Sequence, residues 1–239
     1  MTFEIVPLAG TDIRFVPGPW AMPAALRAEV PASWARMQAR QPHVWDGRIL
    51  GFTPPVIGAD GILRSQAQED AYSAFLAWRE AGFPDIGVMH IFGAALIHSA
   101  DGALIFGIMG PNTVNAGRVY PPGGSLEPRD VRADGVVDVE RCIELELDEE
   151  TGLDAGLARK GRMLMVADGP RIALLRFFHF AENADALVRT IRANLERQED
   201  RELADVVAVR NADEGRAAGA LAEYAAAVLD ALEAGRLGL

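Results

Sequence analysis

Residues 144–153 read ELELDEETGL and place Glu146, Glu149 and Glu150 on adjacent turns of a predicted helix. Like charges three and four positions apart repel one another on a helix surface, so this grouping costs free energy unless something offsets it. One interpretation is an ordinary solvated face on an acidic protein. The other is a set of oxygen ligands for a divalent cation, because hard cations bind carboxylate oxygens.

The helix that carries these acids is predicted over about residues 136–151. Its apolar residues recur at helical spacing and define one core-facing side, namely Val136, Val139, Ile143 and Leu147. Gly152 follows at the position where a left-handed residue ends many helices. Glu146 and Glu150 lie at the edge of the apolar side, where a carboxylate loses hydration and needs either a proton or a cation. The other acids of the helix are expected to face water, namely Glu140, Glu144 and Asp148.

The composition is that of a folded, acidic globular protein. The chain has 239 residues, 50% of them hydrophobic, which is enough for one large domain or two small ones. Its formal net charge is −11, and phosphate backbones select clustered cations, so a nucleic-acid polymer is not expected as a partner. A small phosphorylated molecule stays compatible with this charge, because a metal ion offsets phosphate charge locally.

A cytoplasmic location without a membrane contact is expected. Cys142 is the only cysteine, so no intrachain disulfide forms and a reducing compartment fits. The N-terminal MTFEIVPLAG lacks the basic region that opens a secretory signal. The most apolar stretch, residues 86–98, is shorter than the roughly 20 residues that a membrane-spanning helix requires.

Two regions differ in pattern, and the boundary between them is expected near residue 85. Residues 1–85 contain short strands, helices and all four tryptophans, and this N-terminal extension is expected to pack on the rest of the chain or on a second copy of it, as in a homodimer. Antiparallel hairpins interleaved with helices predict that residues 86–239 form an α+β layered domain on a mixed sheet. The expected hairpins, helices and strand of this domain cover residues 86–109, 136–151, 161–180, 184–198, 205–210 and 213–234.

The acidic helix and the loop before it resemble the box motif of the Nudix hydrolase family. That box has a glycine, then a glutamate, then a helix that ends in Arg-Glu-apolar-any-Glu-Glu-any-Gly-apolar. Here Gly124 belongs to the turn-forming sequence PPGG, Asp130 takes the place of the first glutamate, and residues 146–153 match the helix ending. The resemblance implies a Nudix-type α/β/α sandwich formed by residues 86–239, with an N-terminal β-rich extension.

This chain departs from the family pattern in the loop and at one helix position. The segment Val131–Val137 looks like a seven-residue insertion between Asp130 and the helix. Leu145 stands where the family has an arginine that helps hold the acidic side chains. The resemblance therefore implies an intact metal site, and the missing arginine bears on the rate of turnover more than on metal binding.

The activity implied by the resemblance is hydrolysis of a diphosphate linkage in a nucleoside diphosphate derivative, with Mg²⁺ or Mn²⁺ as cofactor. Glu146 and Glu150 would be metal ligands, Glu149 a ligand or the general base, and the Gly124 carbonyl a backbone ligand. Glu202 is a second candidate for the general base, and the sequence favours the alternative, a helix-end or loop carboxylate without a catalytic role.

The group attached to the diphosphate is indicated by weaker signals. Arg118 is expected to be the cation nearest the box and a candidate for substrate phosphate, with an ordinary surface arginine as the alternative. The order of N-terminal region, aromatic helix and box resembles a Nudix branch that cleaves UDP-hexoses, which favours a nucleotide sugar.

Leu145 and the lengthened loop favour a different protein class, a catalytically weak Nudix-fold sensor or regulator that binds a nucleotide.

Overall fold

A large mixed sheet forms the centre of the structure, a computed structural model that describes residues 3–237. The sheet has nine strands in the order β1, β10, β11, β6, β7, β8 and β13, with β12 beside β7 and β9 beside β6. Strands β11 and β6 pair in parallel, and most other neighbours pair antiparallel. The strand bounds are β1 (Glu4–Leu8), β6 (His90–His98), β7 (Leu104–Met109), β8 (Arg118–Tyr120), β9 (Gly123–Ser125), β10 (Arg159–Asp168), β11 (Arg171–His179), β12 (Leu203–Val209) and β13 (Ala220–Leu221).

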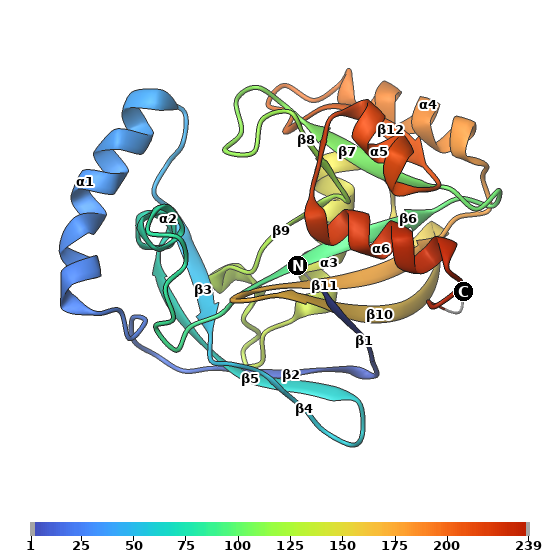
Figure 1. The fold of residues 1–239 in the computed structure, drawn as a ribbon. Helices are drawn as coiled ribbons and strands as arrows, with labels where there is room; N and C mark the ends of the chain where they lie inside the picture. The colour runs from blue at the N-terminus through green and yellow to red at the C-terminus, as the bar shows by residue number, and fades with distance from the viewer. Residues whose placement is uncertain (1–2, 238–239) are drawn as a thin grey trace.

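Helices cover both faces of this sheet (Figure 1). Helices α3 (Val139–Thr151) and α4 (Ala184–Leu195) pack on one face, and α5 (Ala212–Ala218) and α6 (Glu223–Glu233) pack on the other. Successive side chains of a strand point to opposite faces, so β6 sends Ile91 and Ile97 into one core and Leu96 into the other. The predicted α+β fold, with an α/β/α arrangement on a mixed sheet, is confirmed.

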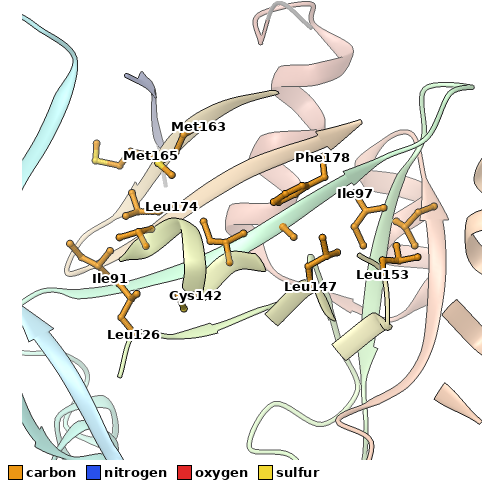
Figure 2. Packing of buried hydrophobic residues seen from close by; sticks show 14 of the residues in the cluster. Ile91, Ile97, Leu126, Cys142, Leu147, Leu153, Met163, Met165, Leu174 and Phe178 are labelled. Atoms are coloured by element: carbon orange, nitrogen blue, oxygen red, sulfur yellow. The ribbon is translucent and has the colours of Figure 1, made fainter. Parts of the chain in front are cut away.

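Helix α3 is held by its apolar side and by both of its ends. Figure 2 shows Cys142 and Leu147 of α3 packed against Ile91 and Phe178 of the sheet, all of them buried. Burying one such side chain contributes about 1.5 to 3 kcal/mol. The helix begins at Val139, later than predicted, because the Asp138 side chain accepts a hydrogen bond from the Arg141 amide and caps the first turn.

The predicted end of this helix is confirmed at Gly152. That residue has φ 67° and ψ 20°, the left-handed conformation that glycine adopts without steric cost, and its amide bonds to the Asp148 carbonyl. The helix therefore ends with its last acids next to the sheet.

The N-terminal region forms a second, smaller sheet and two helices. They are β2 (Gly10–Phe15), β3 (Arg48–Phe52), β4 (Val56–Ile57) and β5 (Ile62–Ala71), with α1 (Ala24–Arg40) and α2 (Tyr72–Glu80). Ile13, Leu50 and Phe52 of this sheet share one hydrophobic core with Ile91 of the large sheet. Strand β1 pairs with β10, so the first strand of the chain belongs to the large sheet.

The inserted loop segment Val131–Val137 joins the box loop to this N-terminal sheet. The Val137 amide donates a hydrogen bond to the Ile13 carbonyl at 2.9 Å, and the Phe15 amide donates one to the Gly135 carbonyl at 2.9 Å. The inserted segment therefore contributes backbone hydrogen bonds to the N-terminal sheet.

The prediction of a single terminal helix was wrong. The terminal helix expected over residues 213–234 is two helices, because Ala220 and Leu221 pair in parallel with β8 between them. A Cβ at Gly219 would lie 2.9 Å from Val119, so the chain needs a glycine for this close approach.

The acids of α3 that were expected to meet only water include two that are paired. Glu140 forms an ion pair with Arg176, and Glu144 forms one with Lys160. Both cations come from the hairpin of β10 and β11, which the helix covers, so sequence spacing on the helix alone did not reveal them.

Within residues 3–237, no helix is long and apolar enough to cross a membrane.

Candidate metal and substrate site

The acidic end of α3 lies against the glycine pair of β9. The Gly123 amide donates a hydrogen bond to Glu150 Oε2 at 3.1 Å. A Cβ built on Gly124 would lie 2.5 Å from Glu146 Oε1. With a side chain at residue 124, the Glu146 carboxylate would have to move from this position beside the strand.

Two of the three grouped acids are removed from water. Glu150 is 4% exposed, and burial, followed by the charges of Glu146 and Glu202, raises its pKa well above the ordinary value. Burial and then the charge of Glu149 raise the pKa of Glu146 to about 7. Carboxylates in this situation favour either a proton or a bound cation.

Glu149 and Glu202 lie at the more open side of the same group. The Glu149 side chain is 49% exposed. Desolvation and then the charge of Glu149 raise the pKa of Glu202, which comes from the segment just before β12. A pocket of about 330 Å³ is lined by both residues and by Glu146 and Glu150. The fold thus brings Glu202 to the acids of α3.

Arg129 is the cation in contact with these acids. Its guanidinium lies 3.3 Å from Glu146 Oε1, 3.2 Å from Glu149 Oε1 and 3.4 Å from Glu127 Oε2. The expectation that Arg118 would be the cation nearest the box was therefore wrong. Residue 145, where the family motif has arginine, is a half-buried leucine, and a guanidinium from the preceding loop contacts the acids.

A short helical turn, η1 (Pro128–Asp130), holds the backbone of Arg129. Glu127 and Asp130 form a reciprocal capping box around it, with Asp130 Oδ2 accepting a hydrogen bond from the Glu127 amide at 2.8 Å. Asp130 is 2% exposed and serves the loop conformation, so the residue that opens the motif does not line the acidic pocket.

The carboxylates are close but are not arranged as a finished cage. Among the described residues 3–237, no three acidic, histidine or cysteine side chains converge in the geometry that holds a metal ion. The ion pairs with Arg129 occupy Glu146 and Glu149, and the hydrogen bond from Gly123 occupies one oxygen of Glu150.

A larger cleft of about 910 Å³ opens from the acidic group and runs between the N-terminal extension and the large sheet. The ring of His90 lies 4.4 Å from that of Phe75 and 5.4 Å from that of Phe92, and the Phe92 ring lies 5.4 Å from that of Tyr224. Together these four residues form an aromatic wall. Trp45 lines the same cleft and is 76% exposed, whereas Trp20 and Trp78 pack edge to face in a buried cluster.

Arg118 lines this cleft rather than the acidic pocket. It comes from β8, and the aromatic wall and Arg79 line the same space. Burial lowers the pKa of His90 to about 3, so its ring is neutral near pH 7, and Nε2 shares a hydrogen bond with Ser125 at 3.1 Å. The cleft therefore offers aromatic faces together with positive charge.

The structure brings most of the predicted site residues together. The acidic end of α3 consists of Glu146, Glu149 and Glu150, and Gly124 and Glu202 lie beside it. Arg118 lies farther along the cleft. The contribution of Arg129 was missed. Its signal was present in the sequence LEPRD, where an arginine lies between two acids in the loop that precedes the helix.

The structure is similar over part of its length to solved Nudix hydrolases. The Nudix hydrolase RenU from M. smegmatis is 17% identical, with a TM-score of 0.42 over 63% of this chain and 86% of that one. The MutT protein from Methanosarcina mazei is 16% identical, with a TM-score of 0.41 over 61% of this chain and 94% of that one.

A third similar structure is a bifunctional NMN adenylyltransferase/ADP-ribose pyrophosphatase from Francisella tularensis, complexed with AMP and a manganese ion. It is 17% identical, with a TM-score of 0.40 over 66% of this chain and 44% of that one. No family model matches the sequence, and no curated protein matches it significantly.

Proposed function

We propose that the protein is a divalent-metal-dependent hydrolase of a diphosphate linkage. The observation that carries this proposal is the burial of Glu146 and Glu150 side by side at the mouth of a cleft, beside a glycine pair that lets them approach the backbone. Buried carboxylates of like charge destabilise a fold unless they are protonated or bind a cation. A cation-binding site explains this arrangement, whereas hydrophobic packing alone does not.

The donor set fits Mg²⁺ or Mn²⁺. Every candidate ligand is an oxygen, from Glu146, Glu149, Glu150 or the Gly124 carbonyl, and hard divalent cations select oxygen ligands. When bound, the cation would neutralise the charge that develops on the diphosphate oxygens. The carboxylates would keep it at the end of α3, where the helix and β9 fix the positions of their backbones.

Two carboxylates are candidates for the general base. Glu149 is exposed on the same turn as the proposed ligands, and Glu202 faces them from another segment. The raised pKa of Glu202 brings its proton affinity closer to that required at neutral pH, which favours it over an ordinary surface carboxylate.

We propose that the substrate is a nucleoside diphosphate derivative and that the attached group, such as a sugar, lies in the large cleft. A volume of about 910 Å³ accommodates a ligand of this size. The aromatic wall would stack with a base, and Arg118 would attract the negative charge of the diphosphate. Since Trp45 and Phe75 come from the N-terminal extension, residues 1–85 would select the substrate and residues 86–239 would carry the reaction.

A catalytically weak nucleotide sensor is the second candidate. The observation that favours it is the ion pairing of Glu146 and Glu149 with Arg129, which leaves no finished metal cage among residues 3–237. A sensor would bind the nucleotide in the cleft and release it unchanged.

Product analysis separates the two functions. The protein is incubated with a panel of nucleotide sugars and dinucleotides in the presence of Mg²⁺ or Mn²⁺, and release of a nucleoside monophosphate is measured by chromatography. Turnover that disappears with EDTA supports the hydrolase. Tight binding of a panel member, measured by calorimetry, without turnover of any member supports the sensor.

A further inference from the structure

Arg129 lies where a bound cation would have to interact with the acids of α3. We propose that Arg129 is a positioning residue that acts as the counter-ion of Glu146 and Glu149 in the metal-free protein and competes with the divalent cation for their oxygens. This inference rests on the proposed metal-dependent function. In this proposal a loop residue, Arg129, holds the acids, because residue 145 on the helix is a leucine and cannot pair with them.

The contacts involve the oxygens that a metal ion would use. Arg129 Nη2 donates to Glu146 Oε1 at 3.3 Å, and the two Nη atoms donate to the two carboxylate oxygens of Glu149 at 3.2 and 3.3 Å. A lone pair that accepts an N–H bond is not available to a cation. The guanidinium therefore occupies one lone pair of each of these oxygens and places a positive charge beside them, so a cation that binds the same oxygens competes with it.

Glu150 is held in a different way. Its hydrogen bond comes from the Gly123 amide, and Arg129 does not contact it. The proposed competition therefore concerns Glu146 and Glu149, and Glu150 would be a ligand that Arg129 does not oppose by direct contact.

The loop fixes the backbone of Arg129, whereas the side chain can move away from the acids. The capping box of Glu127 and Asp130 holds the turn, and Arg141 Nη1 donates a hydrogen bond to the Arg129 carbonyl at 3.1 Å. The Arg129 side chain is 44% exposed, and all of its ion pairs are with acids at the edge of the cleft. The pairs with Glu127 and Glu149 are exposed on both sides and individually weak, so a divalent cation can displace them.

No other cation performs this task among the described residues 3–237. Glu146 and Glu149 have no ion-pair partner there except Arg129. Without it, the two carboxylates would repel each other until a metal ion binds, and this repulsion would favour the metal-bound state.

Binding of Mn²⁺ to the metal-free protein tests the proposal without any measurement of turnover. Arg129→Gln is expected to bind Mn²⁺ about tenfold more tightly than the unchanged protein, because three weak ion pairs no longer have to be broken. Arg132→Gln is the matched control: it removes the same charge from the same loop, and within residues 3–237 the ion pair of Arg132 is with Asp134 alone, on the exposed turn. Arg129→Lys keeps the charge without the fork of donors, so its affinity for Mn²⁺ should lie between those of the unchanged protein and Arg129→Gln.

Equal or weaker Mn²⁺ binding by Arg129→Gln would overturn the competition, as would an equal gain in Arg132→Gln. A double-mutant cycle of Arg129→Gln and Glu149→Gln, measured by urea unfolding in EDTA, tests the counter-ion role independently of metal. Additive effects would overturn it, whereas a favourable coupling supports it. If the unchanged protein binds no Mn²⁺, the proposed metal-dependent function fails, and the cycle still decides whether Arg129 positions the acids.

Discussion

Replacing Glu146 by glutamine should make the metal-free protein more stable at alkaline pH while it weakens metal binding. The pKa of Glu146 is raised from 4.5 to about 7 in the folded protein, chiefly by burial and then by the charge of Glu149. Between these two values the folded state binds more protons than the unfolded state. The stability associated with Glu146 is therefore greatest below pH 4.5 and is lost as pH rises through about 7.

The two pKa values set the magnitude of the effect. The difference between 4.5 and about 7 corresponds to a loss of about 3 kcal/mol once the pH is well above 7. About 2 kcal/mol of this loss falls between pH 5.5 and pH 8.5. The Glu146 side chain is 12% exposed, so solvent screening reduces the value little. The charge of Arg129 is already among the influences that set this pKa, so the loss of that contact is included in the value.

Urea unfolding in EDTA at pH 5.5 and pH 8.5 measures this difference. Glu146→Gln should lose about 2 kcal/mol less stability than the unchanged protein over this range and should be about 3 kcal/mol more stable at pH 8.5. Asp148→Asn, an exposed position on the same helix, should show no such gain. Added Mn²⁺ should stabilise the unchanged protein more than Glu146→Gln. Identical pH profiles for Glu146→Gln and the unchanged protein in EDTA would refute the reasoning.

Three further substitutions test the site and the cleft. Glu150→Gln should lower turnover at least about a hundredfold in a folded protein, because it removes the most buried candidate ligand; circular dichroism checks the fold, and a near-normal rate would exclude Glu150 from the site. Gly124→Ala should weaken Mn²⁺ binding about tenfold or more with little change in melting temperature, because its Cβ would displace the Glu146 carboxylate, and unchanged Mn²⁺ affinity would place the metal elsewhere. Trp45→Ala, at a 76% exposed position, should raise KM for substrates with a large attached group and leave stability unchanged; an unaltered KM across the panel would remove Trp45 from the substrate site.

Local patterns in the sequence were sufficient to predict the elements that carry the candidate site. The apolar spacing of Ile143 and Leu147 predicted which side of α3 is buried, and Gly152 predicted where the helix ends. The same spacing placed Glu146 and Glu150 at the border of the core. These properties depend on residues within a few positions of one another, because helical periodicity and a glycine cap act over single turns.

Contacts between distant segments were harder to predict. The terminal helix is interrupted because Ala220 and Leu221 pair with β8, and this pairing competes successfully with the helical preference of an alanine-rich segment. Glu140 and Glu144 form ion pairs with cations on the hairpin of β10 and β11. In each case the deciding partner lies far away in the sequence, and no local spacing indicates it.

The sequence by itself determined a helix that brings three carboxylates to one end and a glycine pair in the segment before it. Only the tertiary structure decided that Arg129 would contact two of these acids, that Glu202 would face them from another segment, and that Trp45 would line the cleft. The physical reason is the range of the interactions. Hydrophobic periodicity and capping are local, whereas the burial and charge of a site depend on how separate segments pack together.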